Sequence, residues 1–140
     1  MTENIGRQLK IASTQLTKKL DKFAIQYDLT SMQMSVIDFL TLFKNQEMFQ
    51  KDIEHEFNIR RSTASTLLKR MEDKGLIRRI ESNKDARQKQ VILTDLAFQY
   101  EDDIQKFMVE TQQQIHDLLS DEEYTALESS LAKIIKHMGD

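Results

Sequence analysis

Cysteine and proline are absent from the 140 residues, and glycine occurs only at Gly6, Gly75 and Gly139. The lack of cysteine excludes disulfides, thiolate metal sites and cysteine-based redox sensing. Because proline and glycine interrupt helices, a chain with so few of them is predicted to be mainly α-helical. Gly75 is the only glycine away from the ends of the chain, so we expect it to end a helix.

Long apolar runs are missing as well. No stretch approaches the roughly 18 apolar residues that a membrane-spanning helix needs, and no apolar segment follows Met1-Thr2-Glu3-Asn4 as it would in a signal peptide. Hydrophobic residues make up 39% and charged residues 31%, which is typical of a folded soluble protein. We therefore predict a single cytoplasmic domain over residues 1–140 that makes no membrane contact.

The residue patterns of catalytic and metal sites are also lacking. The histidines His55, His116 and His137 are scattered without ligand spacing, so solvated surface histidine is a simpler interpretation than a metal site. No glycine-rich phosphate loop is present. The acidic run at 121–123 stands where a helix is expected to begin, and the helix dipole explains it. We predict that the protein is not an enzyme and uses neither a cofactor nor a metal.

The net charge of −3 hides an uneven distribution of charge. Between residues 60 and 90 there are ten basic and four acidic residues, a net charge of +6, which leaves −9 on the rest of the chain. Such a localised positive charge is typical of a surface that binds a polyanion. A solvated helix face followed by a charged loop would give the same charge, so charge alone does not identify the function.

Apolar spacing of three and four residues predicts helices over about 4–27, from Thr30, over about 50–57 and over about 61–74. A short polar break at 44–47 precedes the third of these helices. After Gly75 the period changes, and the segments 76–81 and 88–94 are short and rich in β-branched residues, which predicts a two-stranded hairpin. Two further helices are expected to begin after Thr94 and Ser120.

Capping signals support these boundaries. Thr30 and Gln33, and again Ser120 and Glu123, have the spacing of a capping box. The last helix is expected to turn an apolar side inward that consists of Leu127, Leu131, Ile134 and Met138. Together with the apolar sides of the first and fifth helices, this exceeds what one small lobe can cover, so a monomer would expose a large apolar patch.

The fourth helix has the features of a DNA-reading helix. With Ala64, Leu67, Leu68 and Met71 buried, its outer face consists of small hydroxyls and cations, which can approach base edges and phosphates closely. An ordinary amphipathic helix is the alternative, but so many serines and threonines weaken a helix unless something else selects them. The predicted DNA-binding residues here are Arg60, Arg61, Ser62, Thr63, Ser65, Thr66, Lys69 and Arg70.

The hairpin adds a second cationic element. Lys84, Arg87 and Lys89 surround its tip with one acid, Asp85, and all four are predicted DNA-binding residues. Arginine suits a narrow, negative minor groove and lysine suits phosphates. Asp85 and Arg87 are spaced to pair, which would hold the guanidinium in a fixed direction.

At this point the chain resembles the MarR (multiple antibiotic resistance) family of winged helix-turn-helix regulators. The resemblance rests on Gly75-Leu76-Ile77-Arg78-Arg79, Asp85-Ala86-Arg87 and Val91-Ile92-Leu93-Thr94, and the order of the flanking helices extends it over the whole chain. Arg60 stands where family members often have a small capping residue, and Ala97 where many have glycine.

The resemblance implies a homodimer, in which residues 1–28 and 96–140 dimerise and residues 29–95 form the DNA-binding lobe. Within that lobe the helix-turn-helix covers about 50–74 and the wing about 76–94. Twofold symmetry then implies a pseudo-palindromic operator with half-site centres about one helical turn apart. The expected role is a transcription regulator that represses by occupying a promoter. A helical protein–protein interaction module without a specific DNA site is the alternative.

Many MarR relatives bind small aromatic acids, so the resemblance also implies a possible effector pocket. The candidate residues for its lining are Phe23, Tyr27, Phe39, Phe43 and Tyr100. Ordinary core packing of the same side chains is the competing interpretation.

Overall fold

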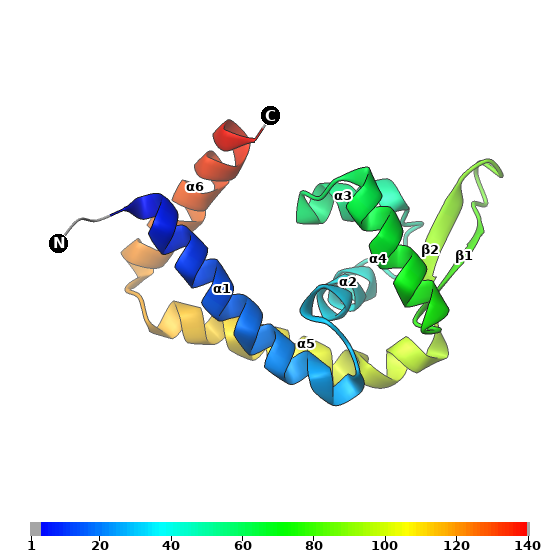
Figure 1. Ribbon diagram of the computed structural model, residues 1–140, viewed down its shortest axis with the longest axis horizontal. Coiled ribbons are helices and arrows are strands. Elements are labelled where there is room, and N and C mark those ends of the chain that lie inside the picture. The colour runs from blue at the N-terminus through cyan, green and yellow to red at the C-terminus, as the bar shows by residue number, and fades with distance from the viewer. Residues whose placement is uncertain (1–3, 140) are drawn as a thin grey trace. The chain divides into compact units, whose positions relative to one another are not determined.

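The computed structural model describes residues 4–139, and Figure 1 shows the order of its elements. These are α1 (Ile5–Ala24), the 3-10 helix η1 (Ile25–Tyr27), α2 (Ser31–Leu42), α3 (Gln50–Phe57), α4 (Arg61–Asp73), β1 (Ile77–Glu81), β2 (Lys89–Leu93), α5 (Asp95–Asp117) and α6 (Asp121–Met138). The predicted fold class, mainly α with a two-stranded hairpin, is confirmed. The chain divides after Ile104 into two compact units, which are described separately.

Side-chain caps fix the starts of several helices. The Thr30 hydroxyl accepts from the backbone N–H of Gln33 while the Gln33 side chain accepts from the N–H of Thr30, both at 3.1 Å. Ser120 and Glu123 make the same reciprocal pair at the start of α6, at 3.1 and 2.9 Å. Both predicted capping boxes are therefore present, and each satisfies amides that the helix leaves free.

Gly75 ends α4 as expected. Its φ of +75° lies in the left-handed region, which glycine enters without steric cost. The Leu76 N–H then donates to the Met71 carbonyl at 2.9 Å, closing the helix end. On the inner face Ala64, Leu68 and Met71 are fully buried, whereas Leu67, which we expected to be buried, remains partly exposed.

A second contact ties the C-terminal end of α4 to the segment before α2. The Lys74 ammonium donates to the backbone carbonyl of Asp28, and it also donates to the side-chain oxygen of Gln33 at 3.2 Å. Asp28 has a left-handed φ of +58°. The same Gln33 oxygen belongs to the cap of α2, so the two helices share one polar junction.

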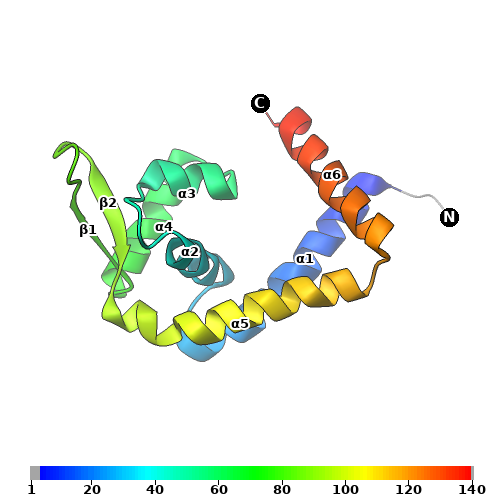
Figure 2. The same cartoon turned by 180° about the vertical axis from the view of Figure 1, so that it is seen from behind.

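The hairpin packs beside α4, as the reverse view in Figure 2 makes clear. Its antiparallel register pairs Ile77 with Leu93, Arg79 with Val91 and Glu81 with Lys89. The Val91 N–H also donates to the Met48 carbonyl at 2.7 Å, so the segment before α3 lines up along β2. This contact from a third segment of the chain stabilises a two-stranded hairpin, whose stability would be marginal alone.

The C-terminal unit differs from the sequence prediction. Among its described residues α6 has no buried side chain. Leu127 and Leu131, which we expected to point inward, are 38% and 36% exposed, and Met138 is 80% exposed. Leu118 lies beyond the end of α5 and is 83% exposed, so it does not extend the apolar side of that helix. The expectation was wrong for one chain because two helices alone cannot enclose this apolar surface.

Candidate nucleic-acid interface

The outer face of α4 is open along its whole length. Every predicted residue of this helix, from Arg60 to Arg70, is exposed. Arg60 occupies the N-cap position in an extended conformation and makes no side-chain cap. Arg60 stands where a small capping residue would supply a side-chain acceptor. The first amides of α4 therefore receive no acceptor from residue 60. Cations and free N–H groups together make this end of the helix electropositive.

Lys69 is not a free cation in this structure. Its ammonium donates to the Asp73 carboxylate at 2.9 Å, one helical turn away. That hydrogen bond is the main reason why the pKa of Lys69 is raised, and the nearby charge of Arg79 opposes the shift. Lys69 therefore lies along the helix toward its C-terminal end, and it would have to leave Asp73 to reach a phosphate.

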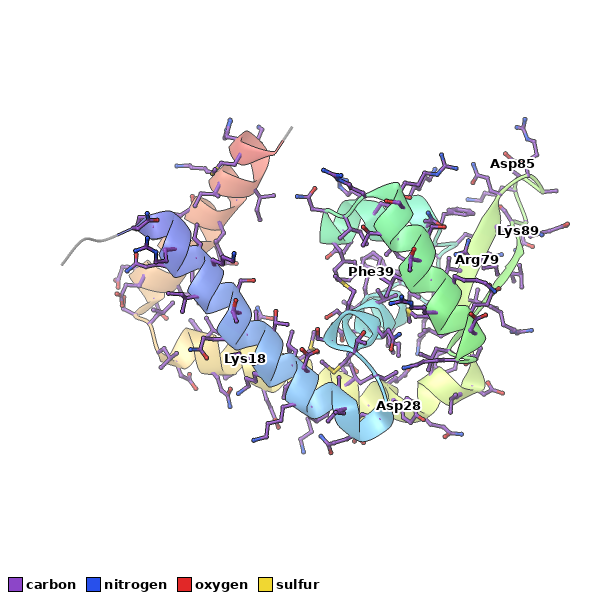
Figure 3. All side chains as sticks on the ribbon, in the orientation of Figure 1. Lys18, Asp28, Phe39, Arg79, Asp85 and Lys89 are labelled. Carbon is purple, nitrogen blue, oxygen red and sulfur yellow. The ribbon has the colours of Figure 1, made fainter. Side chains whose placement is uncertain are left out.

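The tip of the hairpin holds the predicted pair of Asp85 and Arg87. The Arg87 side chain donates to both carboxylate oxygens of Asp85, at 3.2 and 3.3 Å, and its backbone N–H donates to the same group at 3.0 Å. These hydrogen bonds stabilise the charged carboxylate and lower the pKa of Asp85. Figure 3 labels Asp85 at the tip, where the Arg87 side chain is 90% exposed. The geometry is that of an oriented cation.

Glu47, in the loop before α3, anchors the base of this tip, and sequence reasoning missed it. Its carboxylate accepts from the Asn83 N–H at 2.7 Å, from the Gln90 side chain at 3.2 Å and from the Ser82 hydroxyl at 3.2 Å. The buried Ser82 oxygen in turn accepts from the N–H groups of Lys84 and Asp85, at 3.0 and 3.2 Å. A chain of hydrogen bonds thus runs from the helical lobe to the residue that orients Arg87.

Removing this anchor should loosen the wing. We expect Glu47→Ala to lower the free energy of unfolding by about 1–2 kcal/mol, since it leaves donors to a charged acceptor without a partner. Urea unfolding measures this loss, and faster amide exchange at Asn83 locates it. Glu81→Ala is the matched control, because the Glu81 carboxylate lies 4.0 Å from its nearest cation. Equal stability of the two variants would contradict the anchoring role.

The five aromatic residues that were candidates for an effector pocket fall into two groups. The Tyr27 ring lies 5.7 Å from Phe23 and 4.9 Å from Tyr100, and the Phe39 ring lies 5.1 Å from Phe43. The Tyr27 hydroxyl donates to Asp103 at 2.7 Å, and this bond raises the pKa of Tyr27. Phe43 lines a cavity of about 80 Å³, well below the roughly 300 Å³ of small-molecule pockets.

No helix over residues 4–139 combines the length and apolar character needed to cross a membrane. Across the same residues, no cluster of three or more histidine, aspartate or glutamate side chains is arranged to hold a metal ion.

A short helix, a left-handed turn at Asn58, an exposed second helix and a β-hairpin together define a winged helix-turn-helix, a DNA-binding fold. Residues 27–88 match the sequence profile of the MarR family. The transcription regulator MarR from Oenococcus oeni PSU-1 is similar over 95% of this chain and 99% of its own, with 46% identity and a TM-score of 0.89. The chain belongs to the MarR family of transcription regulators.

More distant structures share the fold. MepR of S. aureus in complex with DNA is 24% identical over 99% of this chain and 100% of its own, with a TM-score of 0.88. MepR in its DNA-binding conformation is 24% identical over 98% of this chain and 100% of its own, with a TM-score of 0.86. A comparison with curated proteins finds no match.

Proposed function

We propose that the protein is a homodimer that binds a pseudo-palindromic operator and represses transcription by occupying a promoter. The observation that carries the proposal is the exposed outer face of α4, where hydroxyls and arginines stand on a rigid, internally packed helix. Such a face suits base edges in the major groove, with Ser65 and Thr66 as reading residues. Arg87 would enter the adjacent minor groove.

The proposal of a dimer is supported by apolar side chains that one chain leaves in solvent. On α6, Leu127, Leu131 and Met138 are 38%, 36% and 80% exposed. They recur every three or four residues together with the half-buried Ile134, so they form one stripe along the helix. A second copy of the chain is the occupant that fits, since residues 1–28 and 96–140 would then cover one another across a twofold axis.

The decisive test of the proposed function is selection of bound sequences from random duplex DNA by the full-length protein. We expect recovery of an inverted repeat whose half-site centres lie about 10 base pairs apart, since each lobe reads one half-site. Recovery of unrelated sequences, or no retention of DNA at low salt, would overturn the proposal.

Ser65→Ala and Thr66→Ala should change the recovered bases, whereas loss of a phosphate contact should leave them unchanged.

We also propose that a small aromatic acid releases the regulator from DNA. The partly exposed cluster formed by Phe23, Tyr27 and Tyr100 supports this, since its tilted rings offer an aromatic ligand an apolar surface. Salicylate at roughly ten times its Kd should raise Tm by about 3–6 °C. The neutral analogue salicylamide is the control. An unchanged Tm at millimolar salicylate would exclude this class of ligand.

A further inference from the structure

A cationic groove lies where α3, the start of α4 and the hairpin meet. It has a volume of about 480 Å³, and its walls include Lys51, Arg61, Arg79 and Lys89. Glu54 is the one acidic residue among those that line it. Four cations against one carboxylate leave an excess of positive charge in the groove, so the groove is suited to an anion.

Arg79 projects from β1 toward this groove. Strand alternation places it on the same side of the hairpin as the buried Ile77 and Val91, opposite to Arg78. Among the described residues its Nε atom is buried without a hydrogen-bond partner, and its Nη1 atom lies 3.5 Å from the Gln50 side-chain oxygen. Figure 3 labels Arg79 between α4 and the hairpin. A buried guanidinium nitrogen without an acceptor is costly, so a movement of the side chain that brings Nε to an incoming acceptor would be stabilising.

The other walls of the groove hold further donors in place. The Gln50 side-chain amide donates to the Arg61 carbonyl at 3.3 Å and so ties α3 to the first turn of α4. The Lys51 ammonium lies 5.7 Å from the ring centre of Phe49, at the same end of α3. The Lys89 ammonium reaches only 4.0 Å from Glu81 across the hairpin. Cations from α3, from the start of α4 and from the hairpin therefore line the same groove.

We infer that this groove binds one phosphate of the DNA backbone, with Arg79 and Lys51 as its principal contacts. The inference rests on the proposed function, because the groove lies between the reading face of α4 and the hairpin that carries Arg87. A duplex that touches both elements has to carry its sugar-phosphate backbone across the space between them. Among the described residues the only acceptor for the Arg79 side chain is the Gln50 oxygen at 3.5 Å, a long hydrogen bond. A phosphodiester would supply further acceptor oxygens, and arginine binds phosphate with two parallel hydrogen bonds. Such a contact fixes the position of the lobe on DNA and carries no sequence preference.

Arg79→Gln tests the inference, with Arg78→Gln as the matched control. Both variants remove one positive charge from adjacent positions of the same strand, but only Arg79 faces the groove. We expect Arg79→Gln to weaken operator binding at least tenfold near 0.1 M salt and to reduce the slope of log K against log salt by about one for each protomer, about two for the dimer. Arg78→Gln should change the slope much less. The base preference should be the same in both variants.

Operator duplexes that carry one neutral methylphosphonate at a time identify the phosphate. One position should weaken binding of the wild type and make no further difference to Arg79→Gln, because the two changes remove the same contact. Lys51→Gln should show the same coupling at the same phosphate. Since Lys51 is exposed on α3, this variant keeps the test valid even if Arg79→Gln destabilises the fold.

The outcomes separate the inference from the proposed function. Equal effects of Arg78→Gln and Arg79→Gln, with no phosphate position coupled to Arg79 or Lys51, would overturn the phosphate site while operator binding stands. Failure of the wild type to bind any duplex would overturn the proposed function itself. Coupling of both residues to one phosphate would establish the site.

Discussion

Leu131→Glu is expected to dissociate the dimer and to lower operator affinity by about 10²–10⁴-fold, because a single lobe then binds without the gain from a second linked site. Leu131 lies in the middle of the apolar stripe of α6, and it is 36% exposed in the isolated chain. A carboxylate there would be buried without a partner in the dimer, which costs several kcal/mol. Sedimentation equilibrium measures the mass, and titration of a labelled operator measures the affinity.

Ser129→Glu is the matched control for this prediction. It places the same acid on the same helix, but on the side away from Leu127 and Leu131. This variant should remain dimeric and bind DNA with close to wild-type affinity. If Leu131→Glu sedimented as a dimer with an unchanged operator affinity, the stripe on α6 would not be the dimer contact.

Arg87→Ala is expected to weaken binding to all DNA sequences by about thirtyfold for each half-site, since a hydrogen bond to a charged group contributes about 2 kcal/mol. Two effects add here. The variant loses the cation that would enter the minor groove, and it leaves the Asp85 carboxylate near the phosphates without its partner. The slope of log K against log salt should fall by about one unit for each protomer, about two for the dimer. Fluorescence anisotropy at several salt concentrations measures both quantities, and an unchanged slope would mean that Arg87 does not touch DNA.

Two control variants separate charge from orientation at the tip. Lys84→Ala removes the same charge close by, but no part of the Asp85 pair, so its effect on affinity should be smaller. Asp85→Asn keeps the Arg87 charge and removes the carboxylate that holds it, so affinity should fall a few-fold while the salt slope stays the same. A larger loss from Lys84→Ala than from Arg87→Ala would contradict the central role of Arg87.

Features of this fold that depend on neighbours in sequence could be predicted well. The capping boxes at Thr30 and Ser120 require groups three residues apart, and both are present. Gly75 was expected to end a helix, and its positive φ gives the physical reason. The pairing of Asp85 with Arg87 is likewise local, since the two residues are two positions apart on one turn.

Contacts between distant parts of the chain could not be predicted in the same way. Glu47 lies 36 residues from Asn83, and its sequence surroundings show only a polar break between helices. In the sequence Arg79 looks like an ordinary exposed cation beside Arg78. The structure shows that β1 turns the Arg79 side chain toward Gln50 of α3. The sides of α6 were misjudged for a different reason, because helical periodicity identifies an apolar stripe but not the surface that covers it.

The polar junction at Lys74 restricts the inclination of α4. Because one ammonium joins the end of α4 to the Asp28 carbonyl and to Gln33, α4 cannot tilt as a rigid rod unless these bonds break or the segment before α2 moves with it. The junction therefore couples the C-terminal end of α4 to the segment before α2. We therefore expect a displacement of the segment before α2 to be passed on to α4, and to change the angle at which that helix would meet DNA.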